Sequence, residues 1–276
     1  MPYKTLMIHL ELNGDNEGVL KIAGDLAEQF QAKVIGIAAC QPVQPLYEES
    51  MAAGEILAQD RAEIAKELAA AEAQFRSALS GRAAALEWRS TITYASLADY
   101  IAEEARAADL IITGRDIGGS LLDNTRRVRV GDLVMGAGKP VLIVPQGVSS
   151  LPMNHVFIGW KETREVRRAA ADALPLLSKA HHVTILEVTA SEDASRVRAR
   201  LGDVVTWLDW HGVSTDALAV SSPQADMVAL RDTLRDGKCD LLVAGAYGHS
   251  RIGEWVFGGV TRDLLLDPDF CVLVSH

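Results

Sequence analysis

The stretch "ADLIITG" (residues 108–114) returns as "CDLLVAG" (residues 239–245), 131 positions later. A second pair of stretches, "KPVLIVP" (139–145) and "FCVLVSH" (270–276), is separated by the same interval. Repetition at a fixed interval is the signature of a duplicated structural unit. The apolar, β-branched runs inside these stretches are typical of strands that are covered on both faces of a sheet. The chain therefore contains two copies of one strand-rich unit.

Helical stretches separate the apolar runs in both copies, and this alternation predicts an α/β fold with parallel strands and right-handed crossovers. The expected strands are 4–11, 33–40, 86–93, 108–114 and 139–145 in the first copy, and 154–160, 181–188, 214–220, 239–245 and 270–275 in the second. The expected helices are 16–31, 49–80, 95–106, 127–136, 163–178, 191–211, 224–236 and 258–266. We expect two tandem doubly wound domains, residues 1–147 and 153–276, each with a five-stranded, mostly parallel sheet in the flavodoxin-like strand order 3-2-1-4-5 and with helices on both faces.

Bulk composition excludes several classes of partner. The formal net charge of −10 argues against nucleic acid or an anionic membrane as the main partner, and no apolar run is long enough to span a bilayer. The first residues do not resemble a secretory signal, so we expect a cytoplasmic protein. Cys40, Cys239 and Cys271 are isolated and are interpreted as reduced, buried thiols rather than metal ligands.

The run "GAYGHSRIGEWVFGGVT" (245–261) follows the apolar stretch "DLLVA" and holds five glycines. With the order of elements, this run gives nearly the whole chain a resemblance to the universal stress protein family in its tandem, two-domain form. In that family the fourth strand is followed by G-x2-G-x9-G-[S/T], which holds the phosphates of ATP. Here Gly245, Gly248 and Gly258 match that spacing, whereas Gly259 replaces the hydroxyl residue. Glycines let backbone N–H groups approach phosphate closely, and a helix start adds a favourable dipole.

The resemblance implies an adenine nucleotide site in the C-terminal domain, outside the carboxyl end of the strand that Gly245 ends. The candidate binding residues are Gly245, Gly248, His249, Arg251, Gly258, Gly259, Val260, Thr261, Trp160 and Lys161. Nucleotide-binding members of the family carry Asp at the end of the first strand, where this chain has Lys161 and, in the first copy, Glu11. Lysine cannot accept hydrogen bonds, although it could attract phosphate or cover the pocket beside Trp160. The alternative is a loop shaped by the fold alone, without a ligand.

The first copy is an internal control for this site. Without gaps, Gly248 corresponds to Ile117, and Gly258 and Gly259 correspond to Arg127 and Val128. Side chains then occupy the positions where backbone would meet phosphate. We expect that the first domain does not bind nucleotide in the manner of the family.

Two functions remain open. The first is an ATP-binding regulatory protein with one competent site, and the second is a stress-response scaffold that acts through protein partners. No nucleophile with an adjacent base is present, so no catalytic residue is assigned. Slow ATP hydrolysis would require Thr261, Asp263 or His249 to help bind a metal such as Mg²⁺.

Three further expectations concern surfaces. Universal stress protein domains generally dimerise through their last strands, so the resemblance implies that the last strands of the two copies, 141–145 and 272–275, pair antiparallel within the chain. This pairing would cover two open sheet edges and form a pseudo-dimer that could associate further into a homodimer. The basic run "RRVRV" (126–130) is expected to open a helix as a solvated or interdomain face, with anion binding as the alternative. Trp207 and Trp210 lie three positions apart on a helix, which indicates a packed face.

Overall fold

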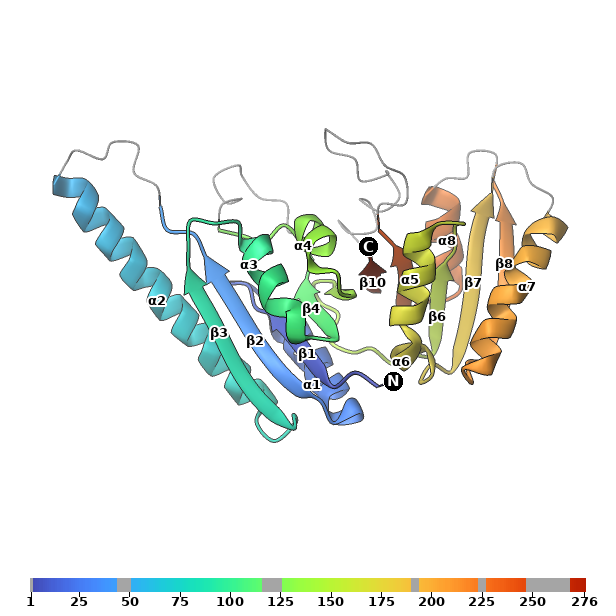
Figure 1. The fold of residues 1–276 in the computed structure, drawn as a ribbon, viewed down its shortest axis with the longest axis horizontal. Coiled ribbons are helices and arrows are strands. Elements are labelled where there is room, and N and C mark those ends of the chain that lie inside the picture. The colour runs from blue at the N-terminus through green and yellow to red at the C-terminus, as the bar shows by residue number, and fades with distance from the viewer. Residues whose placement is uncertain (1, 44–50, 116–125, 190–193, 223–226, 247–268) are drawn as a thin grey trace. The chain divides into compact units, whose positions relative to one another are not determined.

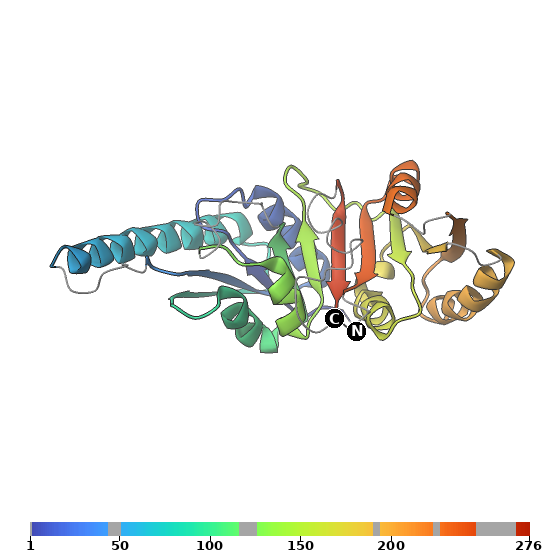
Figure 2. The same ribbon diagram turned by 90° about the horizontal axis from the view of Figure 1, so that it is seen from above.

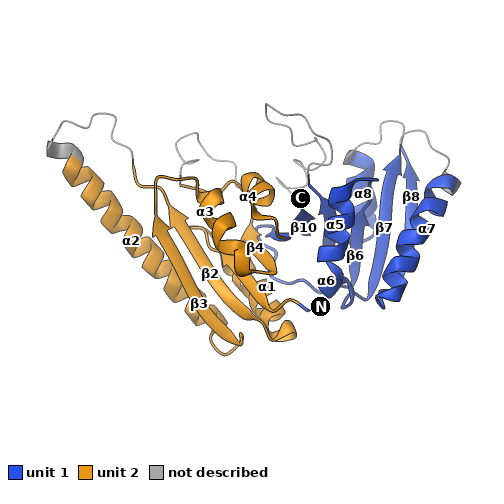
Figure 3. Cartoon of the chain, in the orientation of Figure 1, with its two compact units in different colours: residues 1–2, 140–276 blue, residues 3–139 orange. Residues whose placement is uncertain are grey.

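A computed structural model describes residues 2–43, 51–115, 126–189, 194–222, 227–246 and 269–276 (Figure 1). The chain divides into two compact units (Figure 3). The N-terminal unit holds residues 3–139, and the C-terminal unit holds residues 140–276 together with residues 1–2. The domain boundaries expected from the repeat differ slightly from these units and stay a prediction.

The N-terminal unit is a parallel sheet with the strand order β3-β2-β1-β4. Its elements are β1 (Thr5–His9), α1 (Glu17–Phe30), β2 (Lys33–Cys40), α2 (Met51–Leu79), β3 (Ala85–Ile92), α3 (Leu97–Glu104), a 3-10 turn (Ala105–Ala107), β4 (Leu110–Gly114) and α4 (Val130–Ala137). Helices α1 and α2 cover one face of the sheet, while α3 and α4 cover the other (Figures 1 and 2). The central strands β1 and β4 are buried almost throughout, as their continuous apolar runs predict.

The C-terminal unit contains the strand order β10-β9-β6-β7-β8, in which all neighbours are parallel. Its elements are β5 (Val141–Val144), β6 (His155–Gly159), α5 (Arg164–Asp172), α6 (Leu174–Leu177), β7 (His182–Thr189), α7 (Ala194–Trp210), β8 (Thr215–Ser221), α8 (Met227–Asp236), β9 (Leu241–Gly245) and β10 (Cys271–Ser275). Counted within the second copy, this order is 5-4-1-2-3, the flavodoxin-like order that the repeat predicts. The expected α/β fold class is confirmed.

Strand β5 belongs to the C-terminal unit because it pairs with β10. The two strands run antiparallel, with Ile143 opposite Val272 and Val141 opposite Val274. The antiparallel pairing of the last strands of the two copies is therefore confirmed. The pairing satisfies backbone groups of β10 that would otherwise form an open sheet edge.

Two sequence-based expectations about helices need correction. The single helix expected over 163–178 is divided into α5 and α6, because Pro175 has no N–H to donate and lies in the first turn of a new helix. The expected packing of both Trp207 and Trp210 is wrong for Trp210, which is 86% exposed. Trp207 instead meets His211 edge-on, with ring centroids 5.0 Å apart. The expected helix 258–266 lies outside the described residues.

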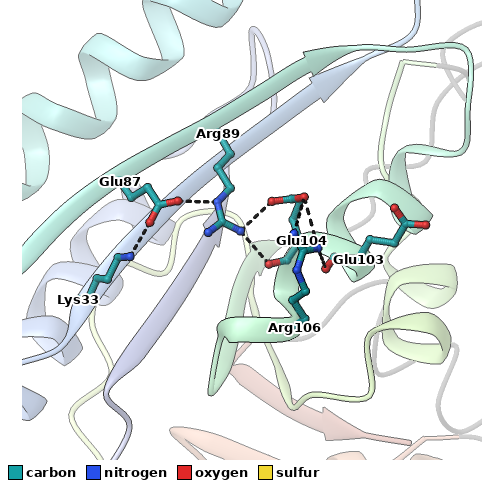
Figure 4. A network of polar contacts seen from close by, with 6 residues as sticks. All are labelled: Lys33, Glu87, Arg89, Glu103, Glu104 and Arg106. Atoms are coloured by element: carbon teal, nitrogen blue, oxygen red, sulfur yellow. Dashed lines mark hydrogen bonds and ion pairs between the residues drawn. The ribbon is translucent and has the colours of Figure 1, made fainter.

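An ion-pair network stabilises the outer strand β3 of the N-terminal unit (Figure 4). Glu87 of β3 contacts Lys33 of β2, and its other oxygen accepts a hydrogen bond from Arg89 Nε at 2.7 Å. Arg89 Nη1 also donates to the Glu104 carboxylate of α3 at 2.7 Å. The network ties one strand to its neighbour and to a helix. The charges also oppose pairing of β3 with a foreign strand.

The aspartate of each repeated stretch performs the same task in both units. Asp109 Oδ2 accepts hydrogen bonds from the backbone N–H groups of Lys4, at 2.7 Å, and Thr5, at 2.9 Å. Asp240 Oδ2 accepts from Asn154, at 2.6 Å, and His155, at 3.0 Å. One carboxylate thus joins the start of the fourth strand to the start of the first strand in each copy.

We expect Asp109→Ala and Asp240→Ala each to lower the free energy of unfolding by roughly 1–3 kcal/mol, because two charge-assisted hydrogen bonds are lost. Denaturant unfolding of the full chain measures the loss. Asp203→Ala is the control, since Asp203 is an exposed residue of α7, and it should change stability by less than about 0.5 kcal/mol. Equal stability of all three variants would contradict the structural role.

Candidate functional site

The candidate site lies at the carboxyl end of the C-terminal sheet, where β6 and β9 end side by side. Gly245 is the last residue of β9. A Cβ atom at this position would lie 2.4 Å from the backbone nitrogen of Val166 and 2.9 Å from Glu165 Cβ, in the first turn of α5. The missing side chain therefore allows α5 to pack directly on the strand. Packing is a requirement for glycine here that does not involve a ligand.

Most of the predicted binding residues lie outside the described residues. They are Gly248, His249, Arg251, Gly258, Gly259, Val260 and Thr261. Their assignment stays a prediction, and so does the suggested contribution of Asp263 to metal binding. Gly245, Trp160 and Lys161 are the predicted site residues whose placement the structure describes.

Trp160 and Lys161 follow β6 directly and face different surroundings. Trp160 is buried, its backbone N–H donates to Leu186 O at 2.8 Å, and its indole Nε1 donates to Glu162 Oε1 at 2.8 Å. Lys161 is exposed. The hydrogen bond from Trp160, with a second from Arg167, holds the pKa of Glu162 below its usual value. The indole therefore fixes a carboxylate beside the strand end, while the lysine remains in contact with solvent.

The first turn of α5 carries its own anion. Thr163 caps the helix by accepting from Val166 N, and the Glu165 side chain is buried. Burial would raise the pKa of Glu165, but hydrogen bonds from Arg164, its own amide and Thr163 outweigh this effect and lower it. A carboxylate near a helix N-terminus is also favoured by the helix dipole. The positive end of the α5 dipole is therefore already compensated by the carboxylate of Glu165.

A buried carboxylate that sequence reasoning missed lies one strand away. Glu187 of β7 is 7% exposed and forms an ion pair with Arg200 of α7. Its second oxygen, Oε2, is buried and has no hydrogen-bond partner within the part of the chain that the structure describes. The signal was present in the sequence, because Glu187 is the one charged residue in the middle of the otherwise apolar and hydroxyl-bearing strand "HVTILEVT".

At the corresponding end of the N-terminal sheet, arginines pair with carboxylates of the same unit. Arg127, which corresponds to Gly258, lies 3.0 Å from Glu11. Arg126 forms an ion pair with Asp60 of α2, whose other oxygen accepts from Val43 N at 2.7 Å. We expected the basic run 126–130 to form a solvated or interdomain face, and this expectation did not include ion pairs within the unit. The first two arginines of the run bind acids of their own unit.

His9 ends β1 of the N-terminal unit and is buried beside Thr113 of β4. Its Nδ1 lies 2.9 Å from Thr113 Oγ1. Burial lowers the pKa of His9 from 6.5 to about 4, because the charged ring would lose its hydration. The imidazole is therefore neutral at physiological pH.

The described residues offer little for metal or thiol chemistry. Within them, no group of three or more His, Cys, Asp or Glu side chains is placed to hold a metal ion. Cys40, Cys239 and Cys271 are free, and burial raises the pKa of Cys271 to about 12. Among the described helices, none is both long and apolar enough to cross a membrane.

Comparison with known proteins identifies the fold. No family model matches the chain, and no curated protein matches it. A universal stress protein from Archaeoglobus fulgidus DSM 4304 superposes with a TM-score of 0.75 at 14% identity, covering 98% of this chain and 95% of that chain. A protein of unknown function from Pseudomonas aeruginosa PAO1 has a TM-score of 0.62 at 16% identity, covering 99% and 92%. A candidate universal stress protein from Pseudomonas aeruginosa UCBPP-PA14 has a TM-score of 0.64 at 16% identity, covering 99% and 93%.

The fold of this chain is therefore that of the universal stress proteins, with two tandem domains of the flavodoxin-like, adenine nucleotide alpha hydrolase-like class. The expected resemblance is confirmed at the level of the fold. At sequence identities of 14% and 16%, the similarity establishes the fold and not the function.

The two strand-end glycines provide a matched test of packing. We expect Gly245→Ala to lower the free energy of unfolding by about 1–3 kcal/mol, because the added methyl group overlaps the backbone of α5. Gly114→Ala should be within about 1 kcal/mol of the parent, because the nearest atom to its added Cβ is Val19 Cγ2 at 4.0 Å. Thermal unfolding of both variants makes the comparison, and a larger loss at Gly114 would overturn it.

His9 makes stability depend on pH. The unfolded chain protonates His9 near pH 6.5 and the folded chain near pH 4, so the unfolded state binds more protons between these values. The contribution of His9 is complete above pH 6.5 and is lost at about 1.4 kcal/mol per pH unit as the pH falls toward 4. Denaturant unfolding at pH 7.5, 6 and 5 should show a flatter dependence in His9→Asn than in the parent. Parallel curves would show that His9 does not titrate as described.

Proposed function

We propose that this protein is a universal stress protein that binds an adenine nucleotide, ATP, in its C-terminal domain and acts as a regulatory protein. The observation that carries the proposal is the spacing Gly245-x2-Gly248-x9-Gly258 directly after β9. In open α/β sheets, ligands bind outside the carboxyl ends of the strands. Gly245, the first residue of the run, is the last residue of β9, which supports this location.

In this proposal the backbone amides of the glycine run hold the phosphates. The amides of Gly248, Gly258 and Gly259 would donate to phosphate oxygens, with Gly245 at the end of the strand. His249 and Arg251 would add positive charge, and Thr261 would supply a hydroxyl near Val260. Lys161 is exposed just beyond β6 and could attract the phosphates, while buried Trp160 shapes the adjoining wall.

The N-terminal domain supports the proposal by contrast. Arg127 and Arg126, from the segment that corresponds to the glycine run, are held by Glu11 and Asp60. Guanidinium groups with carboxylate partners leave little electrostatic gain for an incoming phosphate. We therefore assign one nucleotide site to the chain, in its second domain.

The antiparallel pairing of β5 with β10 supports a proposal about assembly. We propose that the last strands of the two copies join them as an intrachain pseudo-dimer. Association of two chains into a homodimer is a further possibility that light scattering tests directly.

A second candidate function is a stress-response scaffold that no longer holds nucleotide and acts through protein partners. Two observations favour it. Lys161 replaces the carboxylate expected for a nucleotide binder, and Trp210 presents a large aromatic side chain that is 86% exposed. Exposed aromatic side chains of this size are common anchors in protein interfaces.

Calorimetric titration with ATP separates these functions. We expect the parent to bind ATP, and we expect the double variant Gly248→Ile, Gly258→Arg, which introduces the residues of the first copy, to bind roughly two to four orders of magnitude more weakly. Each lost amide–phosphate hydrogen bond accounts for about 1.5–3 kcal/mol.

The reciprocal variant Ile117→Gly, Arg127→Gly is the matched control in the first domain and should leave ATP affinity unchanged. Equal affinity of the parent and the Gly248→Ile, Gly258→Arg variant would move the site elsewhere. Absence of ATP binding to the parent would favour the scaffold.

A further inference from the structure

The buried carboxylate of Glu187 has an unfilled hydrogen-bonding capacity. Glu187 Oε1 pairs with Arg200, whereas Oε2 is buried and accepts no hydrogen bond from any described residue. An ionised carboxylate can accept several hydrogen bonds, and leaving one buried oxygen without a donor costs free energy. Buried polar groups in native proteins nearly always have a partner. Among the described residues no group donates to this oxygen, so the orphan oxygen indicates that a donor from outside them completes the site.

The first copy shows that the fold does not require a charge at this position. Ile8 and Ile158 occupy the same place in the first strand of the two copies. Ile8 pairs with Gly36 of β2 and Ile158 pairs with Ile185 of β7, so Gly36 and Ile185 are equivalent positions. Two residues further along β2 and β7, the equivalent of Glu187 is Ala38.

Ala38 belongs to a buried apolar cluster with Cys40 and with Ile64 and Leu68 of α2. Helix α7 follows β7 as α2 follows β2, and it supplies Arg200 instead. Replacing apolar residues by a buried ion pair gains little or no stability. Since the apolar arrangement is available to the same fold, the pair is explained better by a role in binding than by packing.

The location of Glu187 is suited to a ligand. It lies in the carboxyl-terminal half of β7, and the strand becomes less buried after it, at Val188 and Thr189. Trp160, at the end of β6, is hydrogen-bonded to the neighbouring residue Leu186. These features place Glu187 toward the sheet end at which ligands of open α/β sheets bind.

We propose that Glu187 Oε2 accepts a hydrogen bond from an N–H or O–H group of the nucleoside part of the ligand, and thereby selects that nucleoside. The proposal rests on the proposed nucleotide-binding function and deepens it. A carboxylate accepts hydrogen bonds and repels anions, so it suits the amine of adenine or a ribose hydroxyl and not phosphate. Arg200 keeps the pair neutral overall, and a neutral pair does not oppose the approach of a neutral nucleoside.

Calorimetry with four nucleosides tests the proposal on the full chain. Purine riboside lacks the exocyclic amine of adenosine, and 2′-deoxyadenosine and 3′-deoxyadenosine each lack one ribose hydroxyl. We expect the parent to bind one of these analogues roughly 10- to 150-fold more weakly than adenosine, the ratio for one hydrogen bond to a charged acceptor. The analogue that loses affinity identifies the donor, and equal affinity for all four nucleosides would overturn the proposal.

The matching variant copies the first domain. Glu187→Ala alone would leave the half-buried Arg200 without its carboxylate, so it is combined with Arg200→Leu to create an apolar pair as in the first copy. This double variant should bind adenosine as weakly as the parent binds the discriminated analogue, and should no longer distinguish the two. Glu187→Gln, which preserves the shape of the side chain, should reduce the discrimination in the same direction.

Glu87→Gln is the control, because Glu87 is a strand carboxylate with arginine and lysine partners in the N-terminal unit. It should retain the discrimination of the parent. Discrimination that persists in a folded Glu187→Ala, Arg200→Leu variant would also overturn the proposal. Circular dichroism establishes that each variant is folded.

The experiments distinguish a failure of the proposed phosphate loop from a failure of the proposed Glu187 contact. If ATP binds no more tightly than adenosine while discrimination among the four nucleosides depends on Glu187, the phosphate loop is wrong and the Glu187 contact is supported. If ATP binds more tightly than adenosine and selection ignores Glu187, the loop is supported and the Glu187 contact is wrong. If neither ATP nor adenosine binds, both are wrong.

Discussion

One carboxylate in each copy connects the two central strands on which the rest of the sheet is built. Asp109 and Asp240 stand at the start of the fourth strand and accept two backbone N–H groups at the start of the first strand. These two strands are neighbours in space but are separated by most of a domain in sequence. The carboxylate aligns their amino ends, and their carboxyl ends then coincide at the edge where a ligand can bind.

At the carboxyl ends of these strands, the two copies carry different residues. The first copy places guanidinium groups there and neutralises them with its own acids, Glu11 and Asp60. Both copies end the fourth strand on glycine, but only at Gly245 does the absence of a side chain allow a helix, α5, to approach. The second copy also places a buried acid, Glu187, on the strand beside β6. In the first domain these arginines are neutralised by acids of the same unit, whereas in the second domain the buried Glu187 Oε2 has no hydrogen-bond partner among the described residues. Duplication leaves the fold intact because the strand cores remain apolar in both copies.

The repeat predicted most of the fold. Continuous apolar runs located the strand ends to within two residues. The antiparallel pairing of β5 with β10 was expected from the family resemblance and is consistent with the need to cover open edges. The long helix α2 was evident from its composition, whereas the division between α5 and α6 depends on Pro175, which the periodic pattern obscured. The exposure of Trp210 could not be read from spacing, because spacing shows which residues share a helix face but not what lies against it.

The sequence by itself determined the duplicated α/β plan, the positions of the strands and the contrast between a glycine-rich loop in one copy and bulky residues in the other. These properties follow from local patterns of apolar residues and glycine, which act along the chain. Tertiary structure alone decided that Arg127 reaches Glu11, that Gly245 accommodates the first turn of α5, and that Glu187 meets Arg200. Each of these contacts joins residues on different elements. Its free energy depends on burial and on distances that exist only after the sheet and helices have packed.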